Sequence, residues 1–363
     1  MKKYMRVKLG DVCERGTSNL KLSDVSEKNG EFSVFGASGY IGSVDFYQQG
    51  YPYVAVVKDG AGIGRAMLCP GKTSVIGTMQ YLLPKDNILP KYLFYVVKYM
   101  NLEKYFTGAT IPHIYFKDYK NEEFNFDFWE RQVEIVSVLS KCEKVIDLCK
   151  QELQLLDKLI KARFVELFGD PVSNSYGLPE ATLPDLGEFG RGVSKHRPRN
   201  DIKLLGGKYP LIQTGDVANA GLYITSYSST YSELGLKQSK MWDKGTLCIT
   251  IAANIAKTAI LEFDACFPDS VVGFIANERT NNIFVHYWFS FFQAILESQA
   301  PESAQKNINL KILSELKVIV PEKRKQDQFA SFVKLTDKSK VAVQKALDEA
   351  QLLFDSLMQE YFG

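Results

Sequence analysis

Hydrophobic residues follow a heptad pattern in two long stretches of this chain, residues 129–169 and 323–363. The apolar positions are separated alternately by four and three residues, and no Pro or Gly occurs before the final glycine of each stretch. This pattern predicts coiled-coil helices, each roughly 60 Å long at about 40 residues. The expected seam residues are Ile135, Leu139, Ile146, Leu153, Leu156 and Ile160 in the first stretch and Phe329, Val333, Val343, Leu347, Phe354 and Leu357 in the second.

The second stretch repeats the first at an offset of 194 residues. Arg131-Gln132 corresponds to Lys325-Gln326, and the ending Glu166-Leu167-Phe168-Gly169 corresponds to Glu360-Tyr361-Phe362-Gly363. A shared register and shared ends favour an internal repeat over the alternative, two unrelated amphipathic helices.

The remaining sequence has a different pattern. Short β-branched and aromatic runs, such as 53–57 and 247–251, are separated by Gly, Asp and Asn, which is typical of strands joined by turns. Helices are expected near 91–105 and 285–298. We therefore predict an α+β fold in which two α/β domains are separated by two long helices, paired as an antiparallel coiled coil with a pseudo-twofold internal repeat. The expected segments are a globule at 1–128, a helix at 129–169, a globule at 170–322 and a helix at 323–363.

Composition restricts the classes of function. The chain has 363 residues, 45% of them hydrophobic, and no apolar run approaches the roughly 20 residues that span a bilayer. Six cysteines without paired zinc-ligand spacing and only three histidines favour a reduced, cytoplasmic protein without a metal site. A net charge of +2 is small for a protein that binds DNA alone, so partners are expected to supply many phosphate contacts.

The order globule, helix, globule, helix resembles the DNA-specificity subunit of type I restriction-modification systems over essentially the whole chain. Stretches typical of that family lie at 7–12, 58–64, 162–171 and 304–308. The first globule departs from the pattern at 110–114 and at Asp127, where the second has Pro321.

This resemblance implies a non-catalytic subunit whose two target-recognition domains each read half of a bipartite, asymmetric sequence in double-stranded DNA. The helices would dock two methylation subunits, and restriction subunits would join through these. S-adenosylmethionine, ATP and Mg²⁺ would bind only to the partner subunits, and no membrane would be involved.

Base edges and phosphates are contacted by polar and cationic side chains, which makes such residues in the glycine-rich turn 58–65, around Pro112 and in the run 195–199 candidates for reading DNA. Positions of the second globule that correspond to the first two segments are candidates as well. The alternative is that these residues form tight turns with solvated charges. In the first globule the candidates are Lys58, Arg65, Thr110, His113, Tyr115 and Lys117. In the second they are Lys195, His196, Arg197, Arg199, Asn254, Lys257, Ser303, Gln305, Lys306 and Asn307.

Three other functions are compatible with parts of the sequence. Residues 66–73 satisfy a loose phosphate-loop pattern, although Pro70 lacks an amide hydrogen that such a loop would use. A coiled-coil scaffold without sequence preference and the specificity chain of a fused restriction-methylation enzyme are the others. Under the favoured hypothesis, deleting 323–363 should abolish a 1:2 assembly with methylation subunits and leave the globules folded.

Overall fold

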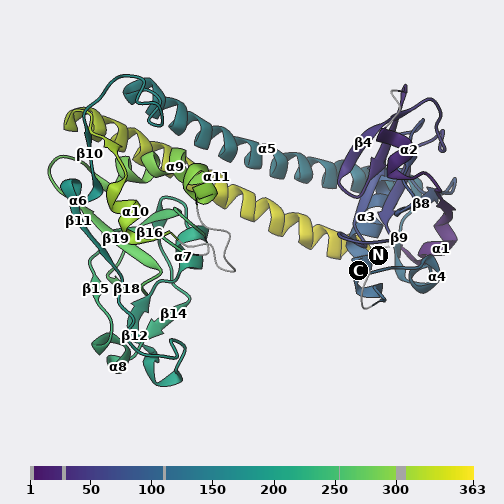
Figure 1. Ribbon diagram of the computed structural model, residues 1–363. Coiled ribbons are helices and arrows are strands. Elements are labelled where there is room, and N and C mark those ends of the chain that lie inside the picture. Colours follow the sequence, from purple (N-terminus) through teal and green to yellow (C-terminus); the bar gives the residue numbers. More distant parts are fainter. Residues whose placement is uncertain (1–3, 27–29, 109–111, 253, 300–307) are drawn as a thin grey trace. The chain divides into compact units, whose positions relative to one another are not determined.

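A computed structural model describes residues 4–26, 30–108, 112–252, 254–299 and 308–363 (Figure 1). The chain forms two compact units. The first unit contains Met1–Lys150 and Lys345–Gly363, and the second contains Gln151–Gln344. Each unit combines mostly antiparallel sheets with helices, and among the described strands one pair in the first unit and two pairs in the second run parallel. The predicted two-domain, mixed α/β organisation is therefore confirmed.

The strands that the structure describes in the first unit form three small sheets. The largest has the order β2-β8-β5-β6, and its hydrogen-bonded neighbours all run antiparallel. Its strands are Cys13–Thr17, Met79–Pro84, Tyr53–Val57 and Ala66–Cys69. The other strands are β3 (Phe32–Gly36), β4 (Gly39–Val44) and β7 (Ser74–Val75) in one sheet and β1 (Met5–Lys8) with β9 (Glu123–Phe126) in another. The helices outside the two stretches of heptads are α1 (Leu9–Val12), α2 (Leu22–Ser26), α3 (Pro90–Met100), η1 (Leu102–Tyr105) and α4 (Phe116–Tyr119).

The second unit has a five-stranded sheet, β11-β19-β16-β17-β13, and a four-stranded sheet, β14-β12-β18-β15. The strands of the first are Gly187–Arg191, Val271–Ala276, Leu247–Thr250, Thr258–Leu261 and Tyr223–Ile224. Those of the second are Ser229–Tyr231, Leu205–Leu211, Ala265–Cys266 and Met241–Trp242, and β10 (Glu180–Ala181) pairs with β20 (Val318–Ile319). The shorter helices are α6 (Leu183–Leu186), η2 (Ile202–Leu204), α7 (Thr214–Asn219), α8 (Glu233–Lys237), α9 (Asn282–Gln299) and α10 (Leu310–Glu315).

Helix α5 (Trp129–Phe168) and helix α11 (Lys323–Phe362) contribute to the core of both units. In the first unit, the start of α5 and the end of α11 join one buried cluster, which includes Ile135 and Phe354. In the second unit, Phe164 near the end of α5 contacts Phe329 near the start of α11, with 5.3 Å between ring centroids. In the second unit Lys340 of α11 is also bonded to Asp157 of α5 (2.7 Å), so contacts later in α11 fall earlier in α5 and the two helices run antiparallel there.

The expected consequence of deleting 323–363 is therefore wrong in one respect. That deletion would remove Phe329 from the second core and Phe354 and Phe362 from the first, and all three side chains are buried. Losing a large buried side chain costs about 3–5 kcal/mol of folding free energy, so the globules would not remain intact.

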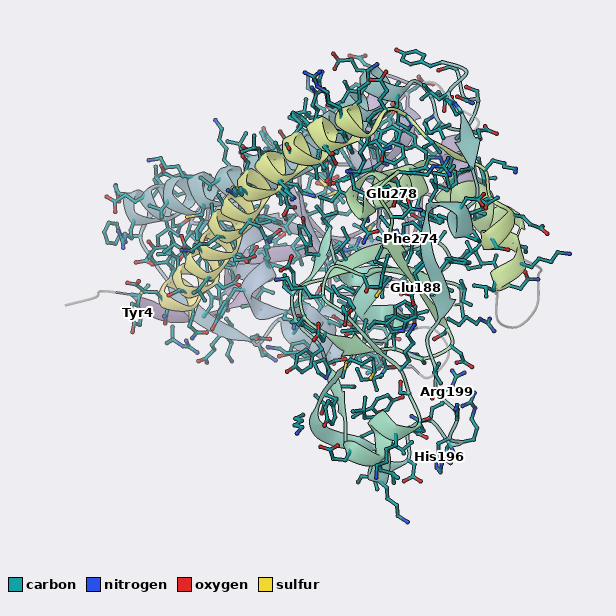
Figure 2. The ribbon with its side chains drawn as sticks, turned by 90° about the vertical axis from the view of Figure 1, so that its left-hand side faces the viewer. Tyr4, Glu188, His196, Arg199, Phe274 and Glu278 are labelled. Carbon is teal, nitrogen blue, oxygen red and sulfur yellow. The ribbon has the colours of Figure 1, made fainter. Side chains whose placement is uncertain are left out.

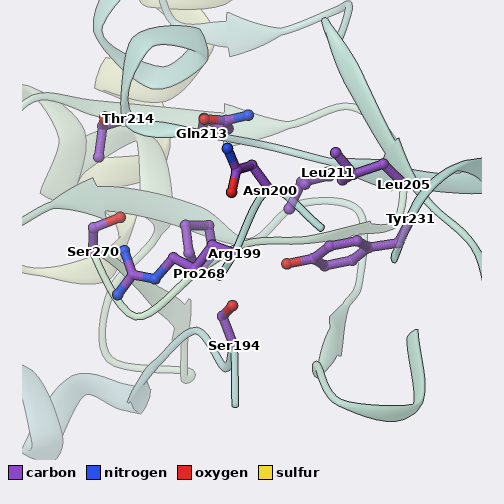
Figure 3. Close-up of a pocket in the computed structure, with 10 residues that line it drawn as sticks. All are labelled: Ser194, Arg199, Asn200, Leu205, Leu211, Gln213, Thr214, Tyr231, Pro268 and Ser270. Carbon is purple, nitrogen blue, oxygen red and sulfur yellow. The ribbon is translucent and has the colours of Figure 1, made fainter. Parts of the chain in front are cut away.

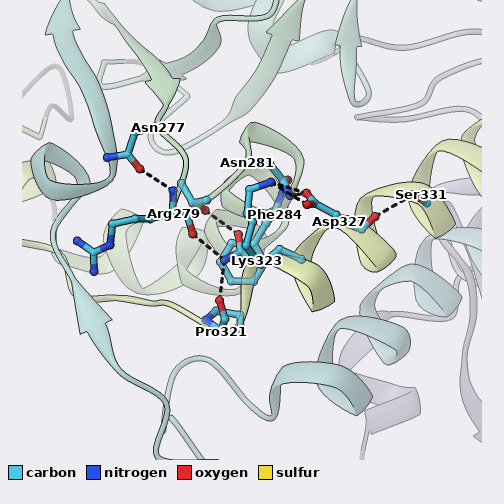
Figure 4. Close-up of polar contacts among 10 residues, drawn as sticks. Asn277, Arg279, Asn281, Phe284, Pro321, Lys323, Asp327 and Ser331 are labelled. Atoms are coloured by element: carbon cyan, nitrogen blue, oxygen red, sulfur yellow. Dashed lines mark hydrogen bonds and ion pairs between the residues drawn. The ribbon is translucent and has the colours of Figure 1, made fainter.

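A buried glutamine joins each long helix to the domain before it. Gln326 Nε2 donates to the carbonyls of Arg279 (3.0 Å) and Pro321 (2.8 Å), and its Oε1 accepts from the Thr280 hydroxyl (2.9 Å). These bonds belong to the wider polar network at the start of α11 (Figure 4). In the first unit, Gln132 Nε2 donates to two carbonyls, at 2.9 and 3.0 Å, and its Oε1 accepts the amide of Leu89. Both side chains have no exposed surface, so neither can exchange these bonds for water.

Replacing Gln326 by Ala should destabilise the second unit. The substitution leaves two carbonyls and one hydroxyl buried without their partner, which should lower the free energy of unfolding by about 3 kcal/mol. Chemical denaturation followed by circular dichroism measures the change. Gln328→Ala on the same helix is the control, because Gln328 is exposed and should change stability by less than about 0.5 kcal/mol. Equal effects of the two substitutions would contradict the assigned role.

Candidate nucleic-acid interface

The glycine loop of the first unit, residues 58–65, connects β5 to β6. Gly60, Gly62 and Gly64 have φ angles of 83°, 81° and 80°, a left-handed backbone that favours glycine. A Cβ on Gly64 would lie only 2.4 Å from the amide nitrogen of Glu103, so this glycine also permits a close backbone contact. The loop closes through hydrogen bonds from Val57 N to Arg65 O (3.0 Å) and from Gly64 N to Val57 O (2.8 Å).

The candidates of the first globule come from two segments, the glycine loop and residues 110–117, and the described parts of these segments lie side by side. Gly60 N donates to Pro112 O (3.1 Å), and Ile114 N donates to Lys58 O (3.0 Å). These bonds bring His113, Tyr115 and Lys117 next to the glycine loop. The exposed Tyr115 ring lies 4.2 Å from the His113 ring and 5.2 Å from Lys117 Nζ. Arg65 donates to the carbonyl of Ala37, and Thr110 lies outside the described residues.

One carboxylate of this surface was not found from the sequence. Asp59 pairs with His113 and lies 3.5 Å from Lys58 Nζ. In the sequence Asp59 is distant from His113, and no local pattern connects the two residues. Asp59 therefore lies against His113 and offsets the charge of Lys58.

The second unit repeats the bonding pattern of the glycine loop at residues 250–257. Thr250 N donates to Lys257 O (2.9 Å), Ala256 N donates to Thr250 O (2.9 Å), and Lys257 N donates to Asn254 O (3.3 Å). The first loop has the equivalent three bonds, including Arg65 N to Gly62 O (3.1 Å). Ala256 has a φ of 58°, in the left-handed region that Gly64 occupies in the first loop. Asn254 is exposed and Lys257 half-buried, whereas Ser303, Gln305, Lys306 and Asn307 lie outside the described residues.

The basic run of the second unit, residues 195–199, is an exposed loop whose side chains pair with acidic residues. Arg197 and Arg199 both contact the carboxylate of Asp269, and His196 Nε2 lies 3.1 Å from Asp201 Oδ2. In Figure 2, His196 and Arg199 lie at the opposite end of this unit from Glu278. Lys195 is exposed, and its amide lies 3.4 Å from the carbonyl of Gln238. Three of its four candidate side chains, those of His196, Arg197 and Arg199, are therefore held by carboxylates.

The structure does not support a phosphate loop at 66–73. Strand β7 begins at Ser74, where a nucleotide-binding loop would continue into a helix. The hydroxyl of Thr73 is already bonded to Pro70 O (2.7 Å) and to the hydroxyl of Tyr53 (3.0 Å). Within the described residues, no three His, Cys, Asp or Glu side chains gather as a metal site, and no helix is long and apolar enough to cross a bilayer.

Comparisons with known proteins point to one family. The family model for the type I restriction modification DNA specificity domain matches residues 1–158 and 180–350. A curated relative from Methanocaldococcus jannaschii, the MjaX type I restriction enzyme specificity subunit, is 22% identical over 292 residues, covering 76% of this chain and 68% of its own. The MjaIX specificity subunit of the same organism is 26% identical over 179 residues, 44% of this chain and 40% of that protein.

Solved structures share the fold. The S subunit of a type I restriction-modification system from M. genitalium has a TM-score of 0.64 at 17% identity, with coverage of 99% of this chain and 96% of that one. A second solved structure, whose subject is the complex assembly of the type I R-M system, has a TM-score of 0.51 at 13% identity. The match covers 99% of this chain and 97% of that one. Because the family model matches most of the sequence, the chain belongs to the type I restriction modification DNA specificity family, whose members are non-catalytic DNA-recognition subunits.

Proposed function

We propose that this chain reads a bipartite, asymmetric sequence in double-stranded DNA, with one half-site recognised by each unit. The observation that carries this proposal is the loop that recurs in both units with the same hydrogen bonds and different side chains. Gly62 and Arg65 in the first loop correspond to Asn254 and Lys257 in the second. Arginine, lysine and asparagine make different contacts with base edges, so equivalent positions would read different bases.

Sequencing of methylated bases tests the proposal. In a host that expresses this chain with its methylation subunits, the modified motif should consist of two unlike half-sites separated by unread bases. The motif should disappear when this chain is omitted. A coiled-coil scaffold without sequence preference predicts no motif that depends on the chain, and that result would refute the proposal. The genes beside this one decide whether the partner is a separate methylation subunit or a fused restriction-methylation enzyme.

We further propose that α5 and α11 form one antiparallel coiled coil between two target-recognition domains, at 1–128 and 170–322. Support comes from the pattern of exposure, because every described seam position of both helices is buried or half-buried. The matching positions of Gln132 and Gln326 support the internal repeat. Lys340 lies seven residues after Val333 and so takes the same seam position one heptad later. It is bonded to Asp157 on α5 (2.7 Å), a polar contact of the kind that fixes register.

Lengthening both helices should change the spacer between half-sites. Insertions of four, seven or eleven residues after Lys150 in α5 and after Gln344 in α11 would add about 1.5 Å of helix per residue. A base pair rises about 3.4 Å, so the unread spacer should become longer while the letters of both half-sites stay the same. Methylated motifs of the variants provide the measurement. A spacer of constant length, or a change in the bases of either half-site, would argue against the proposal that the length of the helices sets the spacer.

The methylation subunits are proposed to dock on the outward faces of the helices, where apolar side chains are exposed. In the first unit these are Val138, Val145 and Leu148 on α5, and in the second they are Leu155 and Leu159 on α5 and Leu335 on α11. Exposed apolar side chains along a helix are typical of a surface that a partner covers.

Restriction subunits would join through the methylation subunits, and S-adenosylmethionine, ATP and Mg²⁺ would bind to these partners. The chain would act in the cytoplasm, where its DNA is found.

A further inference from the structure

A cavity of about 260 Å³ lies beside the basic run of the second unit (Figure 3). Its apolar wall consists of Leu205, Leu211 and Pro268, and its polar side includes Ser194, Asn200 and Gln213. Cavities that hold drug-sized ligands measure roughly 300–1,000 Å³. This cavity is slightly smaller, so it suits a single flat ring system.

Two hydroxyl groups of the cavity have no partner among the described residues. The hydroxyl of Ser194 is buried and unbonded, although the residue is only 6% exposed. The Tyr231 hydroxyl likewise makes no hydrogen bond with the described part of the chain, and Figure 3 shows both groups directed toward the space between the lining residues. A buried hydroxyl without a partner destabilises the folded state. A polar group on a bound ligand would supply the missing hydrogen bond.

The charge of the lining indicates which ligand fits. Among the described lining residues, Arg199 alone is charged, and its guanidinium is already paired with Asp269. The other polar groups are neutral hydroxyls and amides. A phosphate or carboxylate would require unpaired cations or several amide donors, whereas an uncharged heterocycle with donors and acceptors along its edge matches hydroxyls and amides.

We propose that this cavity receives one base of the second half-site, rotated out of the DNA stack. The base would lie against Leu205, Leu211 and Pro268, and its edge would bond to Ser194, Asn200 and Tyr231. Flipped bases are read by hydrogen bonds to this edge and by contacts with apolar or aromatic side chains. Lys195, next to Ser194 of the cavity, would hold a neighbouring phosphate. The inference rests on the proposed function, because it concerns how the second half-site is read.

The test uses the complex of this chain with its methylation subunits and duplexes that carry the motif found by methylation sequencing. Each base of the second half-site is replaced in turn by a fluorescent analogue, and thymines are also probed with permanganate. One position other than the methylated base should become unstacked, with a several-fold rise in fluorescence or reactivity. Asn200→Trp, which fills the cavity from an exposed loop, should remove that signal and preserve the signal of the methylated base.

Ser194→Ala separates binding from folding. Removal of an unbonded hydroxyl should leave the melting temperature unchanged or raise it. The affinity for the motif should nevertheless fall roughly tenfold, the size of one lost base contact. Ser226→Ala, an exposed serine of the same unit, is the control and should bind like the unaltered chain.

Three results would overturn the inference. One is that no base beyond the methylated one unstacks, a second is that Asn200→Trp leaves the signal intact, and a third is unaltered affinity of Ser194→Ala. In all three the complex still binds its motif, so the proposed function stands. If the unaltered complex shows no preference for any motif, the proposed function fails and this inference fails with it.

Discussion

A chain in which Leu155 and Leu159 are both replaced by glutamate should bind one methylation subunit instead of two. These leucines lie one helical turn apart on α5 and are 62% and 49% exposed, although they are among the most apolar residues of the helix. Covering two such side chains contributes about 1.5–3 kcal/mol each, and a glutamate in the same interface would have to lose its hydration. Together these effects should weaken docking roughly 1,000-fold.

Light scattering of the purified complex measures the number of methylation subunits per chain. Gln151→Glu together with Gln154→Glu is the matched control, because it adds the same two negative charges at exposed positions of the same helix. The control should keep two methylation subunits. The leucine variant should also melt like the unaltered chain, because neither leucine belongs to a buried cluster. Two bound subunits at low micromolar concentration in the leucine variant would show that the partner docks elsewhere.

Removing both arginines of the basic run should cause the other large effect. Arg197→Ala together with Arg199→Ala should weaken binding to the motif on the order of 100-fold, because each lost arginine contact costs about 1–3 kcal/mol. For a phosphate contact, each arginine should also lower the slope of affinity against salt by about one. Fluorescence anisotropy over a salt series distinguishes the two contributions.

Arg279→Ala together with Lys317→Ala is the control, since these exposed cations lie away from the basic run in the same unit. It removes equal charge and should change affinity by less than about threefold. The Asp269→Ala variant should increase affinity for DNA instead of lowering it. The substitution frees Arg197 and Arg199 from their carboxylate, so binding to unrelated DNA should strengthen. Equal losses in the arginine variant and the control would mean that only net charge matters.

The long helices and the strands were predictable because their patterns are local. Heptad spacing without glycine or proline predicted a helix at 129–169 and another at 323–363, and the structure has α5 at Trp129–Phe168 and α11 at Lys323–Phe362. The runs at 53–57 and 247–251 became β5 and β16 (Leu247–Thr250). In these segments side-chain periodicity, turn residues and burial all favour the same element.

The site was predictable only in part, because it depends on contacts between distant residues. The glycine loop and the segment after Pro112 were found separately, and only the fold shows that the amide of Gly60 joins them. Asp59 and Asp269 were missed because an acid in isolation gives no sign of the cation it will bind. The cavity beside Arg199 could not be foreseen, because its lining residues come from several loops and strands that no sequence spacing connects.

The division of the first unit has a consequence for synthesis of the chain on the ribosome. Its core needs Phe354, Met358 and Phe362, which follow 194 residues of the second unit. At about 5–20 residues per second, roughly 10–40 s pass between translation of Lys150 and translation of Lys345. Of the two units, the one whose translation begins earlier is therefore the last to complete its core. During that interval its aromatic residues Tyr92 and Tyr95 lack their partners from α11, so part of the apolar surface of the first unit stays uncovered until α11 has been made.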